Sequence, residues 1–466
     1  MLLERFEDKG LSHFSYAVGC EGQGEVVIVD PRRDIDIYLD FAQTRNLRIV
    51  GVLETHIHAD FAAGTKTLAE ATGADIHVSA YDEGQLYETA FTHTPMREGD
   101  AITMGQTRVE ALHTPGHTPE HLSFLVFDLA RAPKVPQVLL SGDFLFVGSL
   151  GRPDLIGDDV KRALAGKLYD SVATKLAPLP DFVEVNPAHG AGSMCGSGMS
   201  ARPMTTLGFE RLANPYLRKG LTREAFVDEI LGHVPPFPPY YKLMKVLNSR
   251  GAEPFDTDRE VDAIRAREFH ALVDSGHVVI DLRDQLAFGA GHIPGSFGIG
   301  SWGSLSTWAA WVVPYETPIL LVGSRNEPIE EAVRSLARVG LDDVRGYLDG
   351  GIEKWIAAGY PVTHVRQLTP TEFVEVRQEA PMHVVDVRTN DEWKDGHVSG
   401  ARHIMGGKLV EHLAELPRNA PLALVCGSGY RSTVAASVLE RHGFEDVVNI
   451  TGGMAAWGHA GLPVER

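Results

Sequence analysis

The chain has 466 residues, of which 44% are hydrophobic and 23% charged, a composition typical of globular proteins with well-buried cores. Its 43 basic and 62 acidic residues give a formal net charge of −19, which argues against nucleic acid or an anionic membrane as a main partner. The sequence has no opening apolar stretch of signal-peptide length and no run of 18 apolar residues, so we expect a cytoplasmic protein without a membrane-spanning segment.

The three cysteines, Cys20, Cys195 and Cys426, are too few and too far apart for a disulfide framework. We therefore expect three free thiols in a reducing compartment. The length alone predicts roughly two to four domains.

Strands and helices alternate through the first part of the chain. Residues 15–20 and 25–31 have the pattern of a hairpin, residues 35–45 have the apolar spacing of a helix, and residues 48–54 return as a strand. Apolar positions in 65–72 and 160–176 indicate further helices. This alternation predicts an αββα sandwich, in which helices cover the outer faces of two sheets.

The strand at residues 48–54 leads into a turn with His56, His58 and Asp60 at every second position. This spacing brings ligand-type side chains around a tight turn into one cavity. A single cluster of this kind is suggestive only, and a metal site needs further ligand-type residues from other parts of the chain.

Three more such pieces lie downstream at the ends of apolar runs, where a rigid sheet gives way to a loop. They are PGHT with His117, SGD with Asp143, and PAHG with His189. In this order and spacing, THIHAD, PGHT, SGD and PAHG resemble the metallo-β-lactamase fold over roughly the first 250 residues. Asp30, at the end of the hairpin, is expected from this resemblance to brace the metal turn.

Within that superfamily the sequence is most similar to the persulfide dioxygenases. The resemblance implies that His56, His117 and Asp143 hold iron. Two imidazoles and one carboxylate leave several positions of an octahedral ion open, which suits a ferrous ion that binds a substrate and dioxygen.

A hydrolase of this fold instead uses two zinc ions. In such sites the second metal takes the Asp of the turn, the residue after it and the PAH histidine, but here Phe61 follows Asp60 and cannot ligate a metal. We therefore predict one metal ion. His58, Asp60 and His189 are interpreted as residues that orient the ligands through hydrogen bonds, with ligation of a second metal as the alternative.

Other residues near the motifs are candidates for binding the substrate. Arg152 could receive a carboxylate or phosphate of a thiol carrier, or could simply pair with Asp154 in its loop. Cys195 lies in a glycine-rich loop, either near a bound persulfide or as a buried inert thiol. Tyr240 and Tyr241 lie in a proline-rich helical stretch that could lid the site, or pack under it.

From residue 260 the chain repeats itself after a predicted linker at residues 251–258. VVIDLRDQLAFGAGHIPGS (278–296) matches HVVDVRTNDEWKDGHVSGA (383–401) at an offset of 105, and the GG-x-x-x-W segments near each end recur as well. Units of this length with alternating strands and helices predict two small α/β domains with parallel sheets. Their D-x-R, GH and GG-x-x-x-W pieces resemble rhodanese domains.

The second copy carries a thiol in a six-residue turn, from Cys426 to Arg431, between a buried strand and a helix. Backbone N–H groups, a helix N-terminus and the guanidinium all favour the thiolate, and the turn residues can cradle a persulfide or an anion such as sulfite. The residues of this cradle are Gly427, Ser428, Gly429 and Tyr430. A phosphatase-like or arsenate-reductase-like cradle shares the C-x4-R spacing and is the alternative.

The first copy has Gly323 in place of the cysteine and Pro328 in place of the arginine. We therefore predict three domains: a dioxygenase domain at 1–250 with a helical lid, a degenerate rhodanese domain at 257–364, and a catalytic rhodanese domain at 365–466.

The whole chain resembles fusions of a persulfide dioxygenase with a rhodanese pair, proteins of sulfide detoxification. The resemblance implies that Fe(II) and O2 oxidise a glutathione or coenzyme A persulfide to sulfite, and that Cys426 passes sulfane sulfur to sulfite to give thiosulfate. A homo-oligomer, dimer or tetramer, is expected. The alternatives are a glyoxalase II-like hydrolase with Zn(II), and a sulfur carrier or sensor that acts through Cys426.

Overall fold

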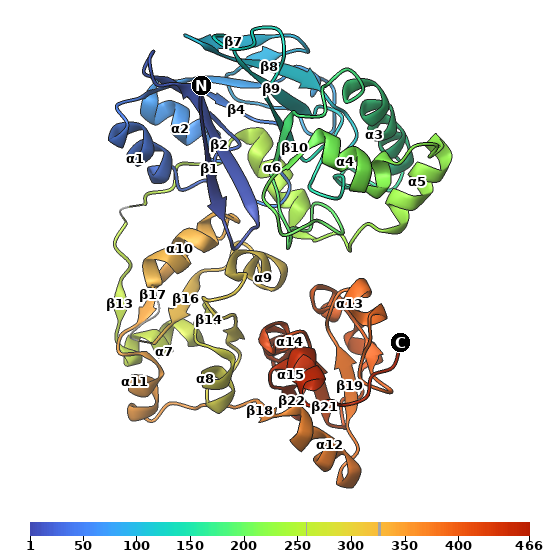
Figure 1. Ribbon diagram of the computed structural model, residues 1–466. Coiled ribbons are helices and arrows are strands. Elements are labelled where there is room, and N and C mark those ends of the chain that lie inside the picture. The colour runs from blue at the N-terminus through green and yellow to red at the C-terminus, as the bar shows by residue number, and fades with distance from the viewer. Residues whose placement is uncertain (258, 325–327) are drawn as a thin grey trace. The chain divides into compact units, whose positions relative to one another are not determined.

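The computed structural model describes residues 1–257, 259–324 and 328–466, and it consists of two compact units (Figure 1). Residues 1–257 and the short segment 337–340 belong to the first unit, and the remaining described residues belong to the second. Across the described residues, no helix is both long and apolar enough to cross a membrane.

The first unit contains two six-stranded sheets, with the orders β1-β2-β3-β4-β5-β6 and β12-β11-β10-β9-β8-β7. The strands of the first sheet are β1 (Leu2–Asp8), β2 (His13–Cys20), β3 (Glu25–Val29), β4 (Arg48–Leu53), β5 (Asp75–Ser79) and β6 (Thr94–Met96). Those of the second are β7 (Ala101–Met104), β8 (Thr107–His113), β9 (Leu122–Asp128), β10 (Val138–Gly142), β11 (Glu184–Pro187) and β12 (Thr205–Thr206).

Helices cover the outer face of each sheet. Tyr38 of α1 (Asp36–Thr44) and Leu68 of α2 (Thr65–Thr72) belong to the core on the first sheet. Leu168 of α3 (Lys161–Lys175) and Phe226 of α5 (Arg223–Gly232) belong to the core on the second. The other helices of this unit are α4 (Leu207–Ala213), the 3-10 helix η1 (Pro215–Leu217) and α6 (Tyr240–Arg250).

Strand β3 shows why the sequence adopts this layering. Val26 and Ile28 belong to the core beneath α1 and α2, whereas Val27 and Val29 belong to the core between the two sheets. Because successive side chains point to opposite faces of a strand, a strand buried on both faces must be apolar throughout. The predicted αββα sandwich is confirmed.

The second unit contains two five-stranded parallel sheets with the same topology, β13-β17-β16-β14-β15 and β18-β22-β21-β19-β20. The strands of the first repeat are β13 (Ala263–Ile264), β14 (Val278–Asp281), β15 (Phe297–Gly298), β16 (Ile319–Val322) and β17 (Val344–Leu348). Those of the second are β18 (Arg366–Leu368), β19 (His383–Asp386), β20 (Arg402–His403), β21 (Leu422–Val425) and β22 (Val447–Ile450).

The helices of the two repeats also correspond. The first repeat has α7 (Ala266–Asp274), α8 (Gln285–Ala290), α9 (Leu305–Val312), α10 (Ile329–Ala337) and α11 (Gly351–Ala357). The second has α12 (Pro370–Glu379), α13 (Asn390–Lys394), the 3-10 helix η2 (Gly406–Glu415), α14 (Tyr430–Arg441) and α15 (Gly453–His459).

The recurring tryptophan of the GG-x-x-x-W segment has the same role in both repeats. The indole N–H of Trp355 donates to the carbonyl of Pro361 at 2.7 Å, and that of Trp457 donates to Pro463 at 3.0 Å. Both rings are buried in the core of their repeat. In both repeats the large ring fills the core while its N–H keeps a hydrogen-bond partner, so no buried donor is left unsatisfied. This double role explains why tryptophan recurs at the position.

Candidate functional site

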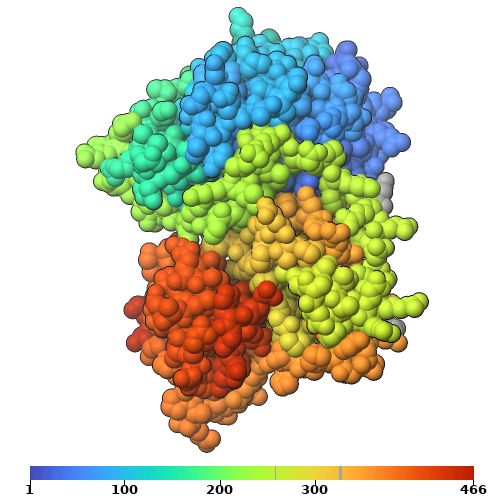
Figure 2. Space-filling model, turned by 180° about the vertical axis from the view of Figure 1, so that it is seen from behind, coloured from blue at the N-terminus to red at the C-terminus, as the bar shows by residue number. Residues whose placement is uncertain are grey.

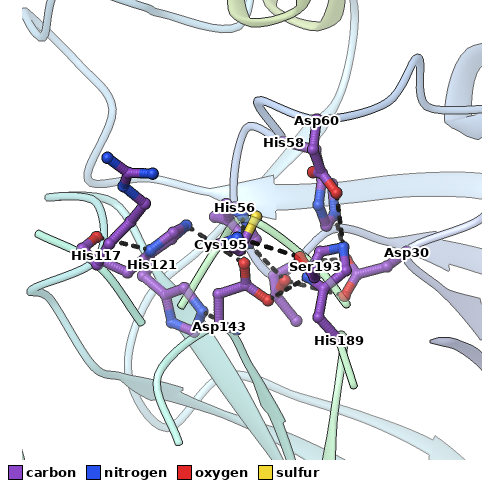
Figure 3. Close-up of polar contacts among 12 residues, drawn as sticks. Asp30, His56, His58, Asp60, His117, His121, Asp143, His189, Ser193 and Cys195 are labelled. Carbon is purple, nitrogen blue, oxygen red and sulfur yellow. Dashed lines mark hydrogen bonds and ion pairs between the residues drawn. The ribbon is translucent and has the colours of Figure 1, made fainter. Parts of the chain in front are cut away.

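Three side chains from the ends of different strands converge in the first unit (Figure 3). His56 follows β4, His117 lies in the loop between β8 and β9, and Asp143 directly follows β10. The Nε2 atoms of His56 and His117 lie 3.9 and 3.4 Å from Oδ2 of Asp143. All three side chains are buried.

The three converging atoms fit a metal ion. His56 Nε2, His117 Nε2 and Asp143 Oδ2 have no hydrogen-bond partner among the described residues, and they lie within 4.8 Å of one another. Donor atoms that each stand about 2.1 Å from one ion are about 3 Å apart, so a small closure of this set would grip a metal. Three buried polar atoms without partners would otherwise be costly.

The Nδ1 atom of His56 must carry the proton of the neutral ring. Thr55 donates its hydroxyl to Asp30 Oδ2 at 2.9 Å and its N–H to Oδ1 at 2.7 Å. The Thr55 hydroxyl, which has only one proton, therefore accepts from His56 Nδ1 at 2.9 Å. Asp30 thus braces the turn, and the lone pair of His56 Nε2 points at the site.

Asp30 itself has a backbone conformation that few residues other than glycine adopt, with φ of 52°. Such a conformation persists where the surroundings hold it, here through both contacts to Thr55. The end of β3 is therefore shaped to support the metal turn.

His117 is oriented in the same way by a carbonyl. Its Nδ1 lies 2.9 Å from the oxygen of Arg152, and because a carbonyl only accepts, Nδ1 carries the proton and Nε2 is left as a ligand atom. Burial, and then the neighbouring imidazoles, hold the pKa of His56 and of His117 well below the ordinary value. Both rings are therefore neutral, the form that binds a metal.

His189 is a buried cation between two carboxylates. Its Nδ1 lies 2.7 Å from Asp143 Oδ1 and its Nε2 lies 2.8 Å from Asp60 Oδ2. Although burial lowers the pKa of His189, these two carboxylates raise it to about 10. Through its Nδ1 contact, His189 orients Asp143, whereas its Nε2 makes no hydrogen bond among the described residues.

His58 is held by a second pair of carboxylates. Its Nε2 lies 3.1 Å from both Asp30 Oδ1 and Glu54 Oε2. Burial lowers the pKa of His58, but the two carboxylates raise it well above the ordinary value. Burial in turn raises the pKa of Glu54 to about 7. His58 is thus occupied by an internal ion pair.

Phe61 occupies the place where a second-metal ligand would be needed. Its ring is fully buried, 4.1 Å from the ring of His13 and 4.5 Å from that of His58. His13, which the sequence analysis did not single out, also packs against His189 at 5.4 Å. Two other groups of buried ligand-type atoms lie nearby, Asp60 with His189 and Cys195, and Asp30 with Glu54 and His58. The set of His56, His117 and Asp143 differs from both in offering two neutral imidazoles.

Two glycines permit the close approach of these strands. A Cβ at Gly151 would lie 1.9 Å from the carbonyl oxygen of Asp143 and 2.9 Å from His117 Nδ1. Gly142 has φ of 54°, and a Cβ there would lie 2.6 Å from His121 Nε2. His121 accepts from the N–H of Asp143 at 3.0 Å, so it positions the backbone of a ligand without being one.

Helix α6 supports the metal turn from the far end of the first unit's sequence. The Asn248 amide donates to the carbonyls of His58 and Phe61 at 2.9 and 2.7 Å and accepts from Ala63 N at 2.9 Å. The ammonium of buried Lys245 donates to the carbonyl of Ile57 at 2.8 Å. The sequence analysis missed both residues, which lie about 190 positions from the turn.

Arg152 is buried and internally bonded. It pairs with both oxygens of Asp154 at 2.6 and 2.8 Å. Its terminal nitrogens also donate to the carbonyls of Met194, Pro235 and Pro236. All three nitrogens are thus engaged, so this geometry favours the loop-pair interpretation over binding of a substrate anion.

Cys195 lies beside the site as a protonated thiol. Its Sγ lies within 4.8 Å of a carboxylate oxygen of Asp60 and of a ring nitrogen of His189. The same atom lies 3.8 Å from the hydroxyl of Tyr241. Burial, followed by Asp60 and Asp143, raises the pKa of the Cys195 thiol well above its ordinary value. Tyr240 and Tyr241 are both buried on α6, so packing is what this structure shows for them.

The second unit contains the thiol loop. Cys426 follows β21, and α14 already begins at Tyr430, so the turn is shorter than the predicted six residues. Gly429, with φ of 100°, precedes the helix and ends the turn. The N–H of Gly429 and the hydroxyl of Ser432 donate to Cys426 Sγ at 3.1 and 3.4 Å. Both donors favour an anionic sulfur.

Arg431 is paired with a residue that the sequence analysis did not single out. Its two terminal nitrogens donate to Glu392 at 2.7 and 2.6 Å. Glu392 also accepts from Thr389 N at 3.0 Å in a capping box of α13. Although burial raises the pKa of Glu392, Arg431 and then Thr389 lower it to about 2.

A signal for Glu392 was present in the repeat. At the offset of 105 that relates Asp281 to Asp386, the first copy has Ala287 in place of Glu392. Cysteine, arginine and their glutamate are thus all missing from the first repeat. Residues 325–327 of its loop, like residue 258 of the predicted linker, lie outside the described residues.

Comparisons with known proteins match three stretches of the chain. The model of the metallo-β-lactamase superfamily matches residues 8–189, and that of the rhodanese-like domain matches 265–358 and 369–460. A metallo-β-lactamase from Staphylococcus aureus is 33% identical in its crystal structure, and the match covers 75% of this chain and 98% of that chain with a TM-score of 0.67.

Two other relatives match the first part of the chain. A hydroxyacylglutathione hydrolase from Francisella philomiragia is 30% identical over 184 residues, 40% of this chain and 65% of that protein. The crystal structure of ETHE1 from Myxococcus xanthus is 27% identical, and the match covers 53% of this chain and 98% of that chain with a TM-score of 0.45.

Proposed function

The chain belongs to the metallo-β-lactamase superfamily and carries two rhodanese-like domains, and on this premise we propose that it is a persulfide dioxygenase joined to a sulfurtransferase. The first reaction is RSSH + O2 + H2O → RSH + H2SO3, with R a low-molecular-weight thiol carrier. In the second, Cys426 takes sulfane sulfur from a persulfide and passes it to sulfite, giving thiosulfate and the free thiol.

One observation supports this proposal above the others: among the described residues, His56, His117 and Asp143 bring two neutral imidazoles and one carboxylate together, and their converging atoms have no hydrogen-bond partner, whereas two neighbouring imidazoles each lie between two carboxylates. His58 is held by Asp30 and Glu54, and His189 by Asp60 and Asp143. One ion with two histidines and one carboxylate is the arrangement of non-haem iron enzymes that use dioxygen.

His56, His117 and Asp143 would hold the ion. A ferrous ion bound there supplies the redox chemistry that dioxygen needs and leaves coordination positions open. The protein side chains fix the two neutral imidazoles through Thr55 and the Arg152 carbonyl, and they bury the cluster so that water competes poorly.

In the second unit, the chain itself supplies the nucleophile. The N–H of Gly429 and the hydroxyl of Ser432 stabilise negative charge on Cys426, and Arg431 lies in the same cradle. Attack of the thiolate on the outer sulfur of a persulfide releases RSH and leaves Cys426 as its persulfide. Sulfite then attacks that outer sulfur, forms the new S–S bond and releases the Cys426 thiolate.

A thioester hydrolase with zinc is the second candidate, because the hydroxyacylglutathione hydrolase is 30% identical over the same region. Such an enzyme would need a second metal next to the first. Phe61 and the paired His58 and His189 argue against that site.

Metal analysis and an oxygen electrode distinguish the two candidates. We expect the purified chain to hold about one iron ion and to consume oxygen when supplied with glutathione persulfide. His117→Ala should lose both iron and oxygen uptake, and His93→Ala, outside the site, should keep both. Two zinc ions per chain, hydrolysis of a glutathione thioester and no oxygen uptake would establish the hydrolase instead.

A further inference from the structure

The degenerate repeat contacts the thiol loop of its partner repeat directly. Gln285, the first residue of α8, donates its amide to the carbonyl of Ser428 at 3.3 Å. A Cβ on Gly429 would lie 3.1 Å from the same amide nitrogen, so Gln285 packs against the residue whose N–H donates to Cys426. Gln285 therefore contacts Ser428, the residue next to the Gly429 N–H that donates to the sulfur of Cys426.

A second contact holds the other end of the loop. The hydroxyl of Tyr430 donates to the carbonyl of Gly300 at 3.0 Å, and its ring meets that of Trp302 at 4.9 Å edge to face. A Cβ on Gly303 would lie 2.5 Å from the Tyr430 ring. The segment 300–303 is thus shaped to receive this one side chain.

The contacts continue along α14, which starts at Tyr430. Glu440 accepts from the imidazole of His292 at 3.0 Å, and Arg441 donates to the carbonyl of Gly295 and lies over the ring of Phe297 at 4.3 Å. Figure 2 shows the surface of the second repeat, in orange to red, against that of the first, in yellow-green to light orange. Both ends of the helix that carries Arg431 are therefore fixed to the degenerate repeat.

We propose that the degenerate repeat contributes to the thiol site. In this proposal, Gln285 and the segment 300–303 hold the loop 426–431 in position. The proposal rests on the proposed sulfurtransferase function of Cys426. The loop contains two glycines and is only four residues long before α14, so its shape depends on what holds its rim. A movement of this rim would change the position of the Gly429 N–H relative to Sγ, which it contacts at 3.1 Å.

This positioning role explains why a copy without cysteine, arginine or glutamate keeps its fold. Within the second repeat, Met454 and Ala455 at the start of α15 donate to the carbonyls of Cys426 and Gly427 and fix the inner side of the loop. Gln285 and Gly300 fix the outer side. A single rhodanese repeat would leave the outer side to solvent.

Two variants of the degenerate repeat test the proposal without altering the loop itself. Gly303→Ala should displace Tyr430, and Gln285→Ala should remove the contact to Ser428. Their matched controls are Gly291→Ala, where a Cβ would meet nothing within 4 Å, and Leu286→Ala, an exposed neighbour of Gln285.

The readouts are sulfur transfer from glutathione persulfide to sulfite without oxygen, and the rate at which iodoacetamide alkylates Cys426, followed by mass spectrometry. We expect both test variants to lower kcat by about fivefold or more and to change the alkylation rate, with sulfite KM within about twofold. The controls should match the parent chain in both measurements.

The outcomes separate this proposal from the function beneath it. An inactive parent chain with unreactive Cys426 would overturn the sulfurtransferase function. An active parent chain with both test variants unchanged would overturn the positioning role alone. The thermal unfolding transition followed by tryptophan fluorescence shows whether the second unit of a variant folds, because all six tryptophans lie between residues 302 and 457. Loss of transfer only in chains that unfold would also contradict the proposal.

Discussion

Glu392 binds Arg431 through two parallel hydrogen bonds of 2.6 and 2.7 Å, so the guanidinium beside Cys426 already has an anionic partner. The positive charge that the sequence assigns to the thiol loop is therefore partly neutralised. What Glu392 contributes is direction, because a bidentate pair fixes the plane of the guanidinium.

Replacing Glu392 with glutamine should impair transfer at Cys426 by releasing Arg431 from this geometry. We expect kcat/KM for thiosulfate formation to fall by about tenfold, the effect of losing one charge-assisted pair. The assay without oxygen measures it, and Glu375→Gln on the neighbouring helix is the control. Unchanged kinetics would show that the orientation of the Arg431 guanidinium does not depend on Glu392.

Acid should weaken the second unit through the same carboxylate. The folded pKa of Glu392, about 2, lies below its ordinary value of 4.5. The ion pair therefore stabilises the fold fully above about pH 4.5, and this contribution is lost as the pH falls towards 2. All six tryptophans lie between residues 302 and 457, so tryptophan fluorescence reports unfolding of this unit.

The measurement is the urea midpoint of that fluorescence transition at pH 6 and at pH 3. The urea midpoint of the parent chain should be higher than that of Glu392→Gln at pH 6. This difference between the two midpoints should be smaller at pH 3. Because Glu392 is partly exposed, the difference should be modest, about 1 kcal/mol or less. A difference that grows in acid would contradict the assigned pKa direction.

Removing the metal should separate the two proposed activities. The ligand set lies in the first unit and Cys426 in the second. A ferrous-ion chelator should therefore abolish oxygen uptake with glutathione persulfide and leave anaerobic transfer to sulfite within about twofold. Loss of both activities on chelation would mean that the thiol site also depends on the ion.

Adding a methyl group at position 151 should disrupt the ligand set, although Gly151 is not itself a ligand. The Cβ of Gly151→Ala would overlap the carbonyl of Asp143 and press on His117 Nδ1. We expect loss of iron and a decrease of about 2–4 kcal/mol in the free energy of unfolding of the first unit. Gly22→Ala, where a Cβ meets nothing within 4 Å, is the control.

The αββα sandwich could be anticipated from local pattern, because strand β3 is apolar at successive positions and such signals lie within a few residues of the element that they predict. The paired repeats were visible as self-similarity at an offset of 105, and the set of His56, His117 and Asp143 came from its resemblance to known motifs at strand ends.

Contacts between distant segments could not be anticipated in this way. Asn248 supports a turn about 190 residues earlier, and Tyr430 fits against Gly303 only because a side chain is missing there. Arg152 illustrates the same limit, since its loop position suited either an anion site or a pair with Asp154, and its contacts with the carbonyls of Met194 and Pro235 come from segments distant in sequence. Glu392 is the intermediate case, visible only through its absence from the first copy.

His58 and His189 are each held between two carboxylates, so the positions of these imidazoles beside His56, His117 and Asp143 are set by contacts within the chain. Which cation His56, His117 and Asp143 would take then depends on supply and on intrinsic affinity, an order in which zinc outranks ferrous iron. The metals in the growth medium of the producing cells therefore decide whether the isolated protein can oxidise a persulfide.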